Sequence, residues 1–504
     1  TYHSLMGEGI AEYMHRMGPG RLEALAGFTW QEQTSSYSSL SEEGFTSDMQ
    51  LSTGVTPMGV RVTSETNEVG YRYLAVFGRL NYNVKNRYLL TASGRRDGSS
   101  RVGSGKQFGN FWALSSAWVF SDEEAVRKLS WLSYGKLRGS IGTTGNDQIG
   151  PNLFAQVYSN TSASRGYQGQ QGVYPVTFAN DNLAWEVNYN SELALELGFL
   201  KNKIMFSMVA YRDWTVNQLL STALPYQAGL PGVFSNYPAN VVNKGLEFSL
   251  QTHNIVRSNF RWTSNVYLTI PSNRLKKFPG LATSVYAARL YLDKSLSEIR
   301  SYHYTGVDPN TGLFTFRDYN KSGGLDPQDL MAGGNFDPKI YGGIGQNFQY
   351  KSWALDLFFE YRVQNGTNPF VAWYLTNPPG MQAPSLVSNG PVEWMDHWRK
   401  PGDQARLQKL TASPVSPAYQ QIFNYVGSDA KVMDASYLRL KSLSLSWRMP
   451  EKWLTKLHLR SCRLYFRGQN LLTWTKFPVA DPETQNPMVL PPVRVLVTGC
   501  QITI

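Results

Sequence analysis

Apolar and polar residues alternate with a period of two along residues 352–363. One parity is wholly apolar and comprises Trp353, Leu355, Leu357, Phe359 and Tyr361. The other parity carries the polar and charged side chains and comprises Ser352, Ala354, Asp356, Phe358, Glu360 and Arg362. Because successive side chains of a β-strand point to opposite faces, the segment predicts a strand with an apolar face and a charged face. Such a strand suits a wall between lipid and a wet lumen, although a strand of a soluble sandwich also alternates.

Strands of this kind recur along the chain, separated by short and long polar connections. We expect them at 20–33, 71–83, 86–97, 109–120, 134–143, 185–200, 202–214, 241–252, 257–270, 339–350, 352–363, 436–448, 459–470 and 493–504. Long polar loops are predicted at 34–68 and 146–182, a tight turn at 201–202 and a short helical turn at 125–131. With boundary errors of a few residues, the pattern predicts roughly 14 to 16 strands.

Composition narrows the fold class. Aromatic residues make up 13% of the chain and charged residues 17%, which is below the roughly 25% usual in soluble domains. No stretch approaches the roughly 18 apolar residues that a transmembrane helix needs. Alternating strands of about ten residues, with aromatic residues near their ends, are typical of outer-membrane barrels. We therefore predict an all-β fold, an antiparallel transmembrane β-barrel with long extracellular loops.

A series of motifs between residues 71 and 146 indicates a family. The motifs are Phe77–Tyr82, Arg87–Ser93, Arg95–Arg101, Phe108–Trp118, Lys136–Ser140 and Gly142–Asn146. Further segments of the same kind are Asn180–Glu186, Asn243–Phe248, Tyr437–Leu445 and Gly468–Thr473. In their order and in their residues, these segments resemble the SusC/RagA family of TonB-dependent outer-membrane receptors over nearly the whole chain. The terminal segment 497–504 also resembles the β-signal of outer-membrane proteins, although that signal usually ends on an aromatic residue and this chain ends on Ile504.

The resemblance implies a barrel of about 22 strands around an N-terminal plug. Residues 1–504 are then expected to be the C-terminal part of the barrel, with the signal peptide, the plug and about six strands lying outside this sequence. The implied function is TonB-dependent import of oligosaccharides or peptides across the outer membrane of a Gram-negative cell. The implied partners are a SusD-like surface lipoprotein that caps the barrel, the TonB complex acting through the plug, and outer-membrane lipid.

The sequence carries no recognised enzyme motif: no nucleophile elbow, Walker A loop, HExxH, clustered Cys and His, or Rossmann glycines. The six histidines are scattered, and His397 lies beside Glu393 and Asp396 in an aromatic segment that indicates packing or ligand contact rather than catalysis. We therefore predict that the chain is not an enzyme. The alternative is a soluble all-β protein that binds or cleaves glycans, but the chain has no propeller repeat of about 40 to 50 residues.

Charge and cysteine content add little to this interpretation. The net charge is +11, but the basic residues are dispersed and form no block, so we expect no nucleic-acid partner. Basic residues on a barrel instead meet lipid phosphates or line a lumen that attracts anionic or neutral polar ligands. Two cysteines, Cys462 and Cys500, are too few for a disulfide framework, and we interpret them as small apolar fillers of strands.

The loop 318–329 is the most specific motif outside the strands. Oxygen-bearing side chains stand at its positions one, three, five, nine and twelve, with Gly323 at position six, which is the spacing of an EF-hand. The expected ligands are Asp318, Asn320, Ser322, the backbone carbonyl of Gly324, Asp326 and Asp329. Ser at position five and Asp at position twelve lower the charge and the expected affinity. The loop therefore predicts a structural Ca²⁺ site, and the alternative is a solvated loop of Asx-turns without an ion.

Aromatic residues in the long loops are candidate ligand contacts, because aromatic faces stack on sugar rings or peptide side chains. They are Tyr167, Tyr174, Trp373, Tyr374, Trp394 and Trp398. The alternative is the interfacial aromatic belt of an outer-membrane barrel, which needs no ligand. We assign no catalytic residue and no substrate-binding residue from the sequence.

Overall fold

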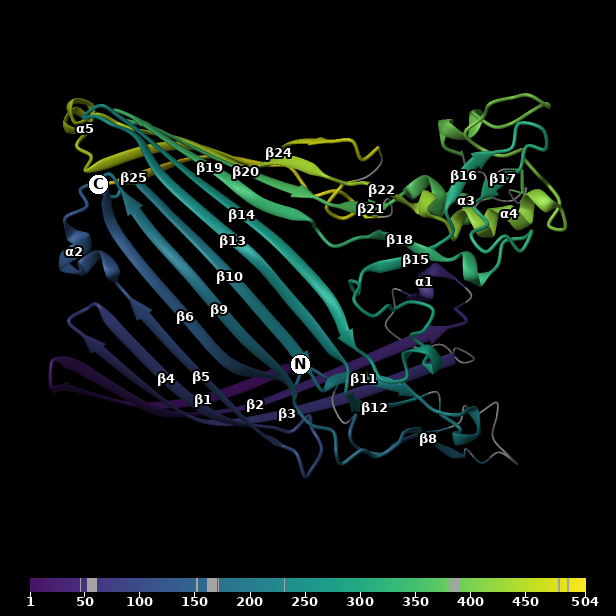
Figure 1. The fold of residues 1–504 in the computed structure, drawn as a ribbon, viewed down its shortest axis with the longest axis horizontal. Helices are drawn as coiled ribbons and strands as arrows, with labels where there is room; N and C mark the ends of the chain where they lie inside the picture. The colour runs from purple at the N-terminus through teal and green to yellow at the C-terminus, as the bar shows by residue number, and fades with distance from the viewer. Residues whose placement is uncertain are drawn as a thin grey trace. The chain divides into compact units, whose positions relative to one another are not determined.

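Antiparallel strand pairing dominates the computed structural model of the chain (Figure 1). The structure describes residues 1–45, 47–51, 61–150, 153–160, 170, 172–230, 232–376, 378, 380–381, 390–478, 481–486 and 489–504. One sheet contains fifteen strands. In spatial order they are β1 (Tyr2–Met17), β2 (Gly20–Glu43), β3 (Arg61–Val84), β4 (Tyr88–Ser99), β5 (Phe108–Trp118), β6 (Leu132–Asn146), β9 (Glu186–Phe199), β10 (Ile204–Val216), β13 (Asn240–Val256), β14 (Phe260–Lys277), β19 (Ile340–Tyr350), β20 (Trp353–Val363), β23 (Tyr437–Arg448), β24 (Ser461–Thr475) and β25 (Val495–Thr503).

The connections carry short strand pairs and helices. The pairs are β7 (Val157–Asn160) with β8 (Val173–Thr177), β11 (Gln218–Ala223) with β12 (Gly232–Tyr237), β15 (Glu298–Ser301) with β18 (Met331–Asn335), β16 (Tyr304–Val307) with β17 (Phe314–Phe316), and β21 (Asn365–Thr367) with β22 (Val432–Asp434). The α-helices are α1 (Asp48–Leu51), α2 (Glu124–Arg127), α3 (Pro369–Thr376), α4 (Pro417–Val426) and α5 (Glu451–Leu457). Across the described part of the chain, no helix combines the length and apolarity that a membrane crossing requires.

The chain divides into two compact units. Unit 1 comprises Thr1–Val119, Arg138–Glu192 and Asp213–Asn240, and unit 2 comprises Phe120–Leu137, Leu193–Arg212 and Val241–Ile504. Unit 1 has a small apolar cluster that consists of Val102, Phe111 and Trp185. Unit 2 has a larger cluster, built from its long connections, which consists of Phe314, Val371, Tyr374, Trp394, Ile422 and Tyr425.

Register extends the predicted apolar face of β20 onto its neighbour. Trp353 lies opposite Trp447, and Leu355 lies opposite Leu445 on β23. Directly opposed residues of antiparallel strands present their side chains on the same face. Trp353 is nonetheless 48% exposed, so the sheet presents large apolar side chains to its surroundings instead of to a protein core. That arrangement is the one expected of a wall in contact with lipid.

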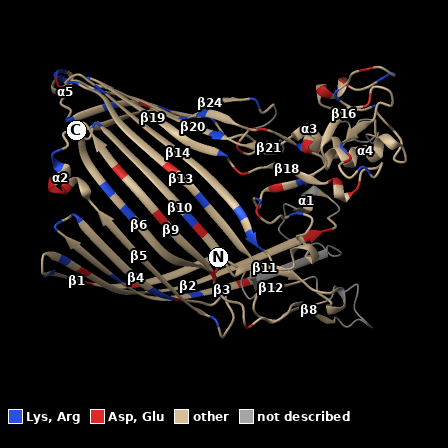
Figure 2. Cartoon of the chain, in the orientation of Figure 1, with Lys and Arg blue, Asp and Glu red and all other residues tan. Residues whose placement is uncertain are grey.

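The opposite face of the same strands is polar and internally bonded. Asn347 on β19 donates from Nδ2 to Asp356 Oδ1 on β20 at 2.6 Å. Glu360 on β20 stands opposite Arg439 on β23. Lys and Arg recur along the strands and connections without gathering into one block (Figure 2). The alternation predicted from the sequence therefore separates an apolar from a charged face.

The fifteen strands of the main sheet confirm the predicted number, and α2 confirms the helical turn near residue 125. Two predictions about the N-terminal part were wrong. Strand β1 was missed, because Gly7 and Gly9 and apolar residues of both parities hide its period. The loop predicted at 34–68 is shorter, because β2 and β3 continue in register until Glu43 lies opposite Arg61. A ladder of backbone hydrogen bonds is enough to extend a strand whose side chains are polar on both faces.

Candidate functional site

The long connections of unit 2 leave its strands at one end. Strands β13 and β14 are joined through 257–259, and β19 and β20 through 351–352. Because neighbouring strands are antiparallel, the connections 278–339 and 364–436 start and finish at the opposite ends of these strands. The connection 476–494 between β24 and β25 leaves from the same end. We call this the loop end of unit 2.

A cavity of about 670 Å³ lies at the loop end. Its lining residues are Tyr211, Asn243, Pro271, Ser272, Asn273, Arg274, 293–298, Asn335, Asp337, Pro338, Lys339, Tyr341 and Arg362. Asn273 donates from Nδ2 to Asn243 Oδ1 at 2.6 Å, and its own Oδ1 accepts the backbone N–H of Leu296 at 3.0 Å. The Ser295 hydroxyl donates to the carboxylate of Asp337. These bonds tie the connection 278–339 to the strand ends and shape the cavity.

A second cavity of about 410 Å³ shares residues 296–298 with the first. Its other lining residues are Ala288, Arg289, Ile299, Arg300, Phe336 and Lys431. The Arg300 guanidinium donates to the hydroxyl of Tyr291 and also lies over its ring. Burial lowers the pKa of the Lys431 ammonium group. The two cavities are therefore neighbours across one short segment, and both are lined by cationic side chains.

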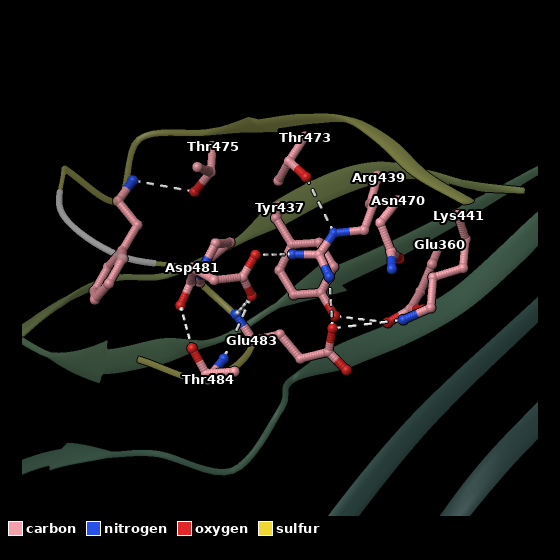
Figure 3. Close-up of polar contacts among 12 residues, drawn as sticks. Glu360, Tyr437, Arg439, Lys441, Asn470, Thr473, Thr475, Asp481, Glu483 and Thr484 are labelled. Atoms are coloured by element: carbon pink, nitrogen blue, oxygen red, sulfur yellow. Dashed lines mark hydrogen bonds and ion pairs between the residues drawn. The ribbon is translucent and has the colours of Figure 1, made fainter. Parts of the chain in front are cut away.

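A buried arginine joins strand β23 to the connection 476–494 (Figure 3). Arg439 is 1% exposed; its Nε donates to Thr473 Oγ1 at 3.0 Å, its Nη1 donates to Glu483 Oε2 at 2.6 Å, and its Nη2 donates to Asp481. Burial by itself raises the pKa of Asp481, but the bond from Arg439 and backbone N–H groups of the connection lower it overall. The carboxylate therefore stays ionised beside the guanidinium.

Three further side chains extend this network on the charged face. Lys441 Nζ lies 3.1 Å from Glu360 Oε2 and 3.5 Å from Glu483 Oε2. The Tyr437 hydroxyl donates to Glu360 Oε1 at 2.6 Å. Each charged group therefore has a partner of opposite sign, and no nucleophile is paired with a base. Such a network fixes the shape of a connection and has no evident chemistry of its own.

The aromatic cluster of unit 2 holds helices α3 and α4 together. Phe314 stacks on Tyr425 with ring centroids 4.1 Å apart, and Tyr374 meets Tyr425 edge-on at 5.7 Å. The Ser416 hydroxyl caps α4 by accepting the backbone N–H of Tyr419 at 3.2 Å. Burial raises the pKa of the Tyr425 hydroxyl to about 12. This cluster is a packing core for the long connections.

The aromatic residues predicted as ligand contacts differ in their burial. Tyr374 is 2% exposed and Trp394 is 9% exposed, so both rings belong to the core of the cluster and are unsuited to contact a ligand. Trp373 packs against the edge of the same cluster. The Trp398 indole N–H donates to a backbone carbonyl at 2.8 Å. Tyr174 in β8 of unit 1 is 47% exposed, and Tyr167 lies outside the described residues.

The loop 318–329 folds around its own carboxylates. Asp329 is fully buried: Oδ1 accepts the N–H of Tyr319 at 2.7 Å, and Oδ2 accepts the N–H of Asp326 at 3.0 Å. Asp318 Oδ2 accepts the N–H of Gly323 at 2.9 Å. Gly323 has φ +85°, which explains the glycine at position six.

The predicted ligands of this loop also bond to one another. Asp326 Oδ2 accepts from Asn320 Nδ2 at 2.9 Å and from Ser322 Oγ at 3.2 Å. The Asn320 bond is the main reason that the pKa of Asp326 is lowered. The Ser322 hydroxyl is also 3.0 Å from the carbonyl oxygen of Gly324. The oxygens predicted to bind Ca²⁺ are thus gathered in one loop, and Ca²⁺ binding stays a prediction.

The described residues, those of the loop 318–329 included, contain no group of three or more His, Cys, Asp or Glu side chains placed to hold a metal ion. His397, which could have been drawn with Glu393 and Asp396 as such a group, instead bonds through Nδ1 to the Trp394 carbonyl at 2.9 Å.

Sequence reasoning missed the cavity-lining cations and the buried pairs of Arg439. Part of the signal was available, because pairing the predicted strands 352–363 and 436–448 places Glu360 near Arg439 and Arg362 near Tyr437. The contacts of Asp481 and Glu483 carried no such signal, since they lie in a connection that has no period.

Comparison with known proteins gives three related findings. A family model described as TonB dependent receptor-like, beta-barrel matches residues 8–471. TonB-dependent receptor P3 of Formosa agariphila is 27% identical over 510 residues, covering 95% of this chain and 48% of that protein. TonB-dependent receptor SusC of Bacteroides thetaiotaomicron is 25% identical over 438 residues, covering 82% of this chain and 41% of that protein. The chain thus spans about half the length of the curated relatives it matches.

A solved structure has the same fold. The structure of the RagAB peptide transporter superposes with a TM-score of 0.84 at 22% sequence identity, covering 100% of this chain and 56% of that chain. At this identity, the comparison establishes the fold and leaves the ligand open.

Proposed function

The chain belongs to the family of TonB-dependent receptor-like β-barrels, and from this premise we propose that it forms the wall and outer loops of a nutrient importer. The chain is an outer-membrane protein of the SusC/RagA type. The proposed cargo is an oligosaccharide or a peptide. The proposed partners are a SusD-like surface lipoprotein, which would cover the loop end, and the TonB complex, which would supply the energy.

The observation that carries the proposal is the family match over residues 8–471. The two faces of the sheet support it, because large apolar side chains such as Trp353 are exposed on one face and charged side chains bond to one another on the other face. The names of two similar proteins support the proposed cargo and the proposed partner. These proteins are the TonB-dependent receptor SusC and the RagAB peptide transporter.

Family membership overturns the soluble alternative, a glycan-binding or glycan-cleaving β-protein. Import changes no covalent bond in its cargo, so the proposal assigns no catalytic residue. Binding at the loop end and movement of the connections would be the whole mechanism.

Uptake in cells tests the proposal. Cells that carry or lack the gene would be fed fluorescent pools of oligosaccharides and of peptides, with and without an active TonB complex. We expect uptake of one pool to need both the gene and TonB, and the tagged protein to co-purify with a SusD-like lipoprotein from detergent-solubilised outer membranes. Equal uptake of both pools in all strains would overturn the proposal.

A further inference from the structure

The two neighbouring cavities at the loop end of unit 2 are lined by more cations than anions. Their Lys and Arg side chains are Arg274, Arg289, Lys294, Arg300, Lys339, Arg362 and Lys431. Their carboxylates are Asp293, Glu298 and Asp337. A concave surface lined mainly by one sign of charge concentrates ligands of the opposite sign.

The three carboxylates are fewer than the seven cations, and two of them make their closest contacts with other groups. Asp293 makes its ion pair with Lys276, which is not a lining residue, at 2.6 Å. Asp337 accepts from the Ser295 hydroxyl. Among the described residues, Lys294, Lys339 and Lys431 form no side-chain ion pair. The positive charge of the cavities is therefore available to a ligand.

Arg362 is placed to bind such a ligand. It stands opposite Tyr341 in the β19–β20 register, and its guanidinium carbon lies 6.0 Å from the centre of the Tyr341 ring. Its Nε is buried and has no hydrogen-bond partner among the described residues. A guanidinium in the wall of a cavity binds carboxylate and sulfate oxygens in pairs.

Lys431 occupies a similar position in the smaller cavity. It is half-buried, and burial disfavours its charged form, which lowers its pKa. An anion bound beside it would offset that cost. Together, Arg362 and Lys431 place a cation in each cavity on the two sides of the segment 296–298.

The remaining lining favours a sugar over a peptide. Tyr211 and Tyr341 offer aromatic rings, and three asparagines offer fixed amides: Asn243, Asn273 and Asn335. Aliphatic contact in the larger cavity comes, among the described residues, from Pro271, Leu296 and Pro338 alone. Rings combined with a few placed polar groups are suited to a sugar, which presents flat apolar faces edged by hydroxyls.

We propose that these two cavities bind an oligosaccharide that carries carboxylate or sulfate groups. The proposal rests on the proposed import function and names the class of its cargo. The anionic groups bind the guanidinium of Arg362 and the ammonium of Lys431, and the tyrosine rings contact the sugar faces. Sulfate and carboxylate share the chemistry required here, so the test separates them.

The test uses the full receptor complex, purified in detergent, on a glycan array that presents uronate, sulfated and neutral oligosaccharides. We expect binding to be concentrated on the uronate spots or on the sulfated spots. Binding to neutral spots alone, or to no spot, overturns the proposal. A hexamer of glutamate is titrated in parallel. If this peptide binds more tightly than every sugar, the cavities are a peptide site and the oligosaccharide proposal is wrong.

Variants then locate the site. For the best anionic oligosaccharide, we expect Arg362→Gln and Lys431→Met each to raise Kd at least tenfold, while Lys400→Gln, which removes a cation outside the cavities, leaves Kd unchanged. Each variant must retain the heat-modifiable gel migration of a folded barrel. Folded variants with unchanged Kd would overturn the assignment of the site.

Uptake assays distinguish the anionic-oligosaccharide inference from the proposed import function on which it rests. TonB-dependent uptake of neutral oligosaccharides without uptake of anionic ones would refute the anionic cargo but not the proposed import function. Loss of all TonB-dependent uptake would refute the importer itself, whatever the array shows.

Discussion

Arg439 and Glu483 form an ion pair with 2.6 Å between Nη1 and Oε2, although 44 residues separate them along the chain. The same guanidinium also donates to Asp481. Strand β23 and the connection 476–494 are therefore held together by one cation that is 1% exposed. Because a buried cation must keep its partners, this connection is fixed to the charged face of the sheet.

Replacing Arg439 with Ala should destabilise the protein strongly. The change leaves Asp481 beside a cavity without its cation, and breaking a buried pair typically costs about 3–5 kcal/mol. The midpoint of urea unfolding, followed by heat-modifiable migration on gels, measures the loss. Arg467→Ala is the matched control, because this arginine is exposed on β24 and its removal should cost less than about 0.5 kcal/mol. Equal effects of the two substitutions would contradict the buried pair.

Acid should weaken the same contact. The pKa of Asp481 is lower in the folded protein than its unfolded value of about 3.9, so its ionised form stabilises the fold above that value. The contribution of Asp481 to stability is then constant from neutral pH to about pH 5 and falls as the pH drops below about 4. Urea midpoints at a series of pH values test this dependence. In Asp481→Asn the urea midpoint should be lower at neutral pH than in the unaltered protein. It should also decline less as the pH falls below about 4.

The strands could be predicted wherever a two-faced environment imposed a period. Residues 352–363 alternate because one face meets lipid and the other meets polar groups, and β20 formed there within one residue of the expected limits. The alternation of apolar and polar side chains is lost in β1, which contains Gly7 and Gly9, and in the end of β2, where polar residues continue to Glu43. Backbone pairing extends those strands without any requirement on side chains, so the sequence offered no pattern to detect.

The site was harder to predict than the wall, because it depends on contacts between distant segments. Tyr374 and Trp394 were reasonable ligand candidates as aromatic residues in a long connection, but α3 and α4 bury both of them. Arg362 carried only the signal of a charge near a strand end. Its proposed role depends on Tyr341, which β19 places opposite it, and on the connection 278–339, which lines the same cavity.

The aromatic cluster should control the order of α3 and α4. Phe314 is 2% exposed and stacks on Tyr425, so Phe314→Ala leaves a cavity that should cost about 3–5 kcal/mol locally. Hydrogen exchange should accelerate in both helices while the main sheet keeps its protection. Phe423→Ala on α4 removes a ring that is 48% exposed and serves as the control. Unchanged exchange in Phe314→Ala would mean that the cluster does not hold the helices.

The loop 318–329 should bind Ca²⁺ weakly. Five oxygen side chains and one backbone carbonyl are gathered there, but Ser322 and Asp329 stand where stronger ligands are usual. Isothermal titration of a chelator-stripped sample should show heat with Ca²⁺ above the buffer blank. Asp318→Asn should reduce that heat and leave the fold intact, because its amide oxygen can still accept an N–H bond. No heat from the unaltered protein would establish the ion-free Asx-turn loop.

The two cysteines test the register of the last strand pair. Cys462 lies opposite Ile502 and Cys500 opposite Leu464, and the two sulfur atoms are 3.7 Å apart. A disulfide needs about 2.05 Å, so a small movement is enough to join them. We expect the disulfide reagent diamide, which takes up the two thiol hydrogens and is reduced to its hydrazine, to link them within one chain. Both thiols would then resist maleimide until a reductant is added.

Two controls make this crosslink a measure of register. In urea, where the strands are separated, diamide should link the pair more slowly, because the sulfurs meet only by chance. A two-residue shift of β25 that set Cys462 opposite Ile504 would move the sulfurs apart by about 7 Å along the strand, beyond the reach of a disulfide. Full maleimide labelling of the folded protein after diamide treatment would therefore show that β24 and β25 pair in a different register, and that Cys462 and Cys500 act only as the apolar fillers that the sequence predicted.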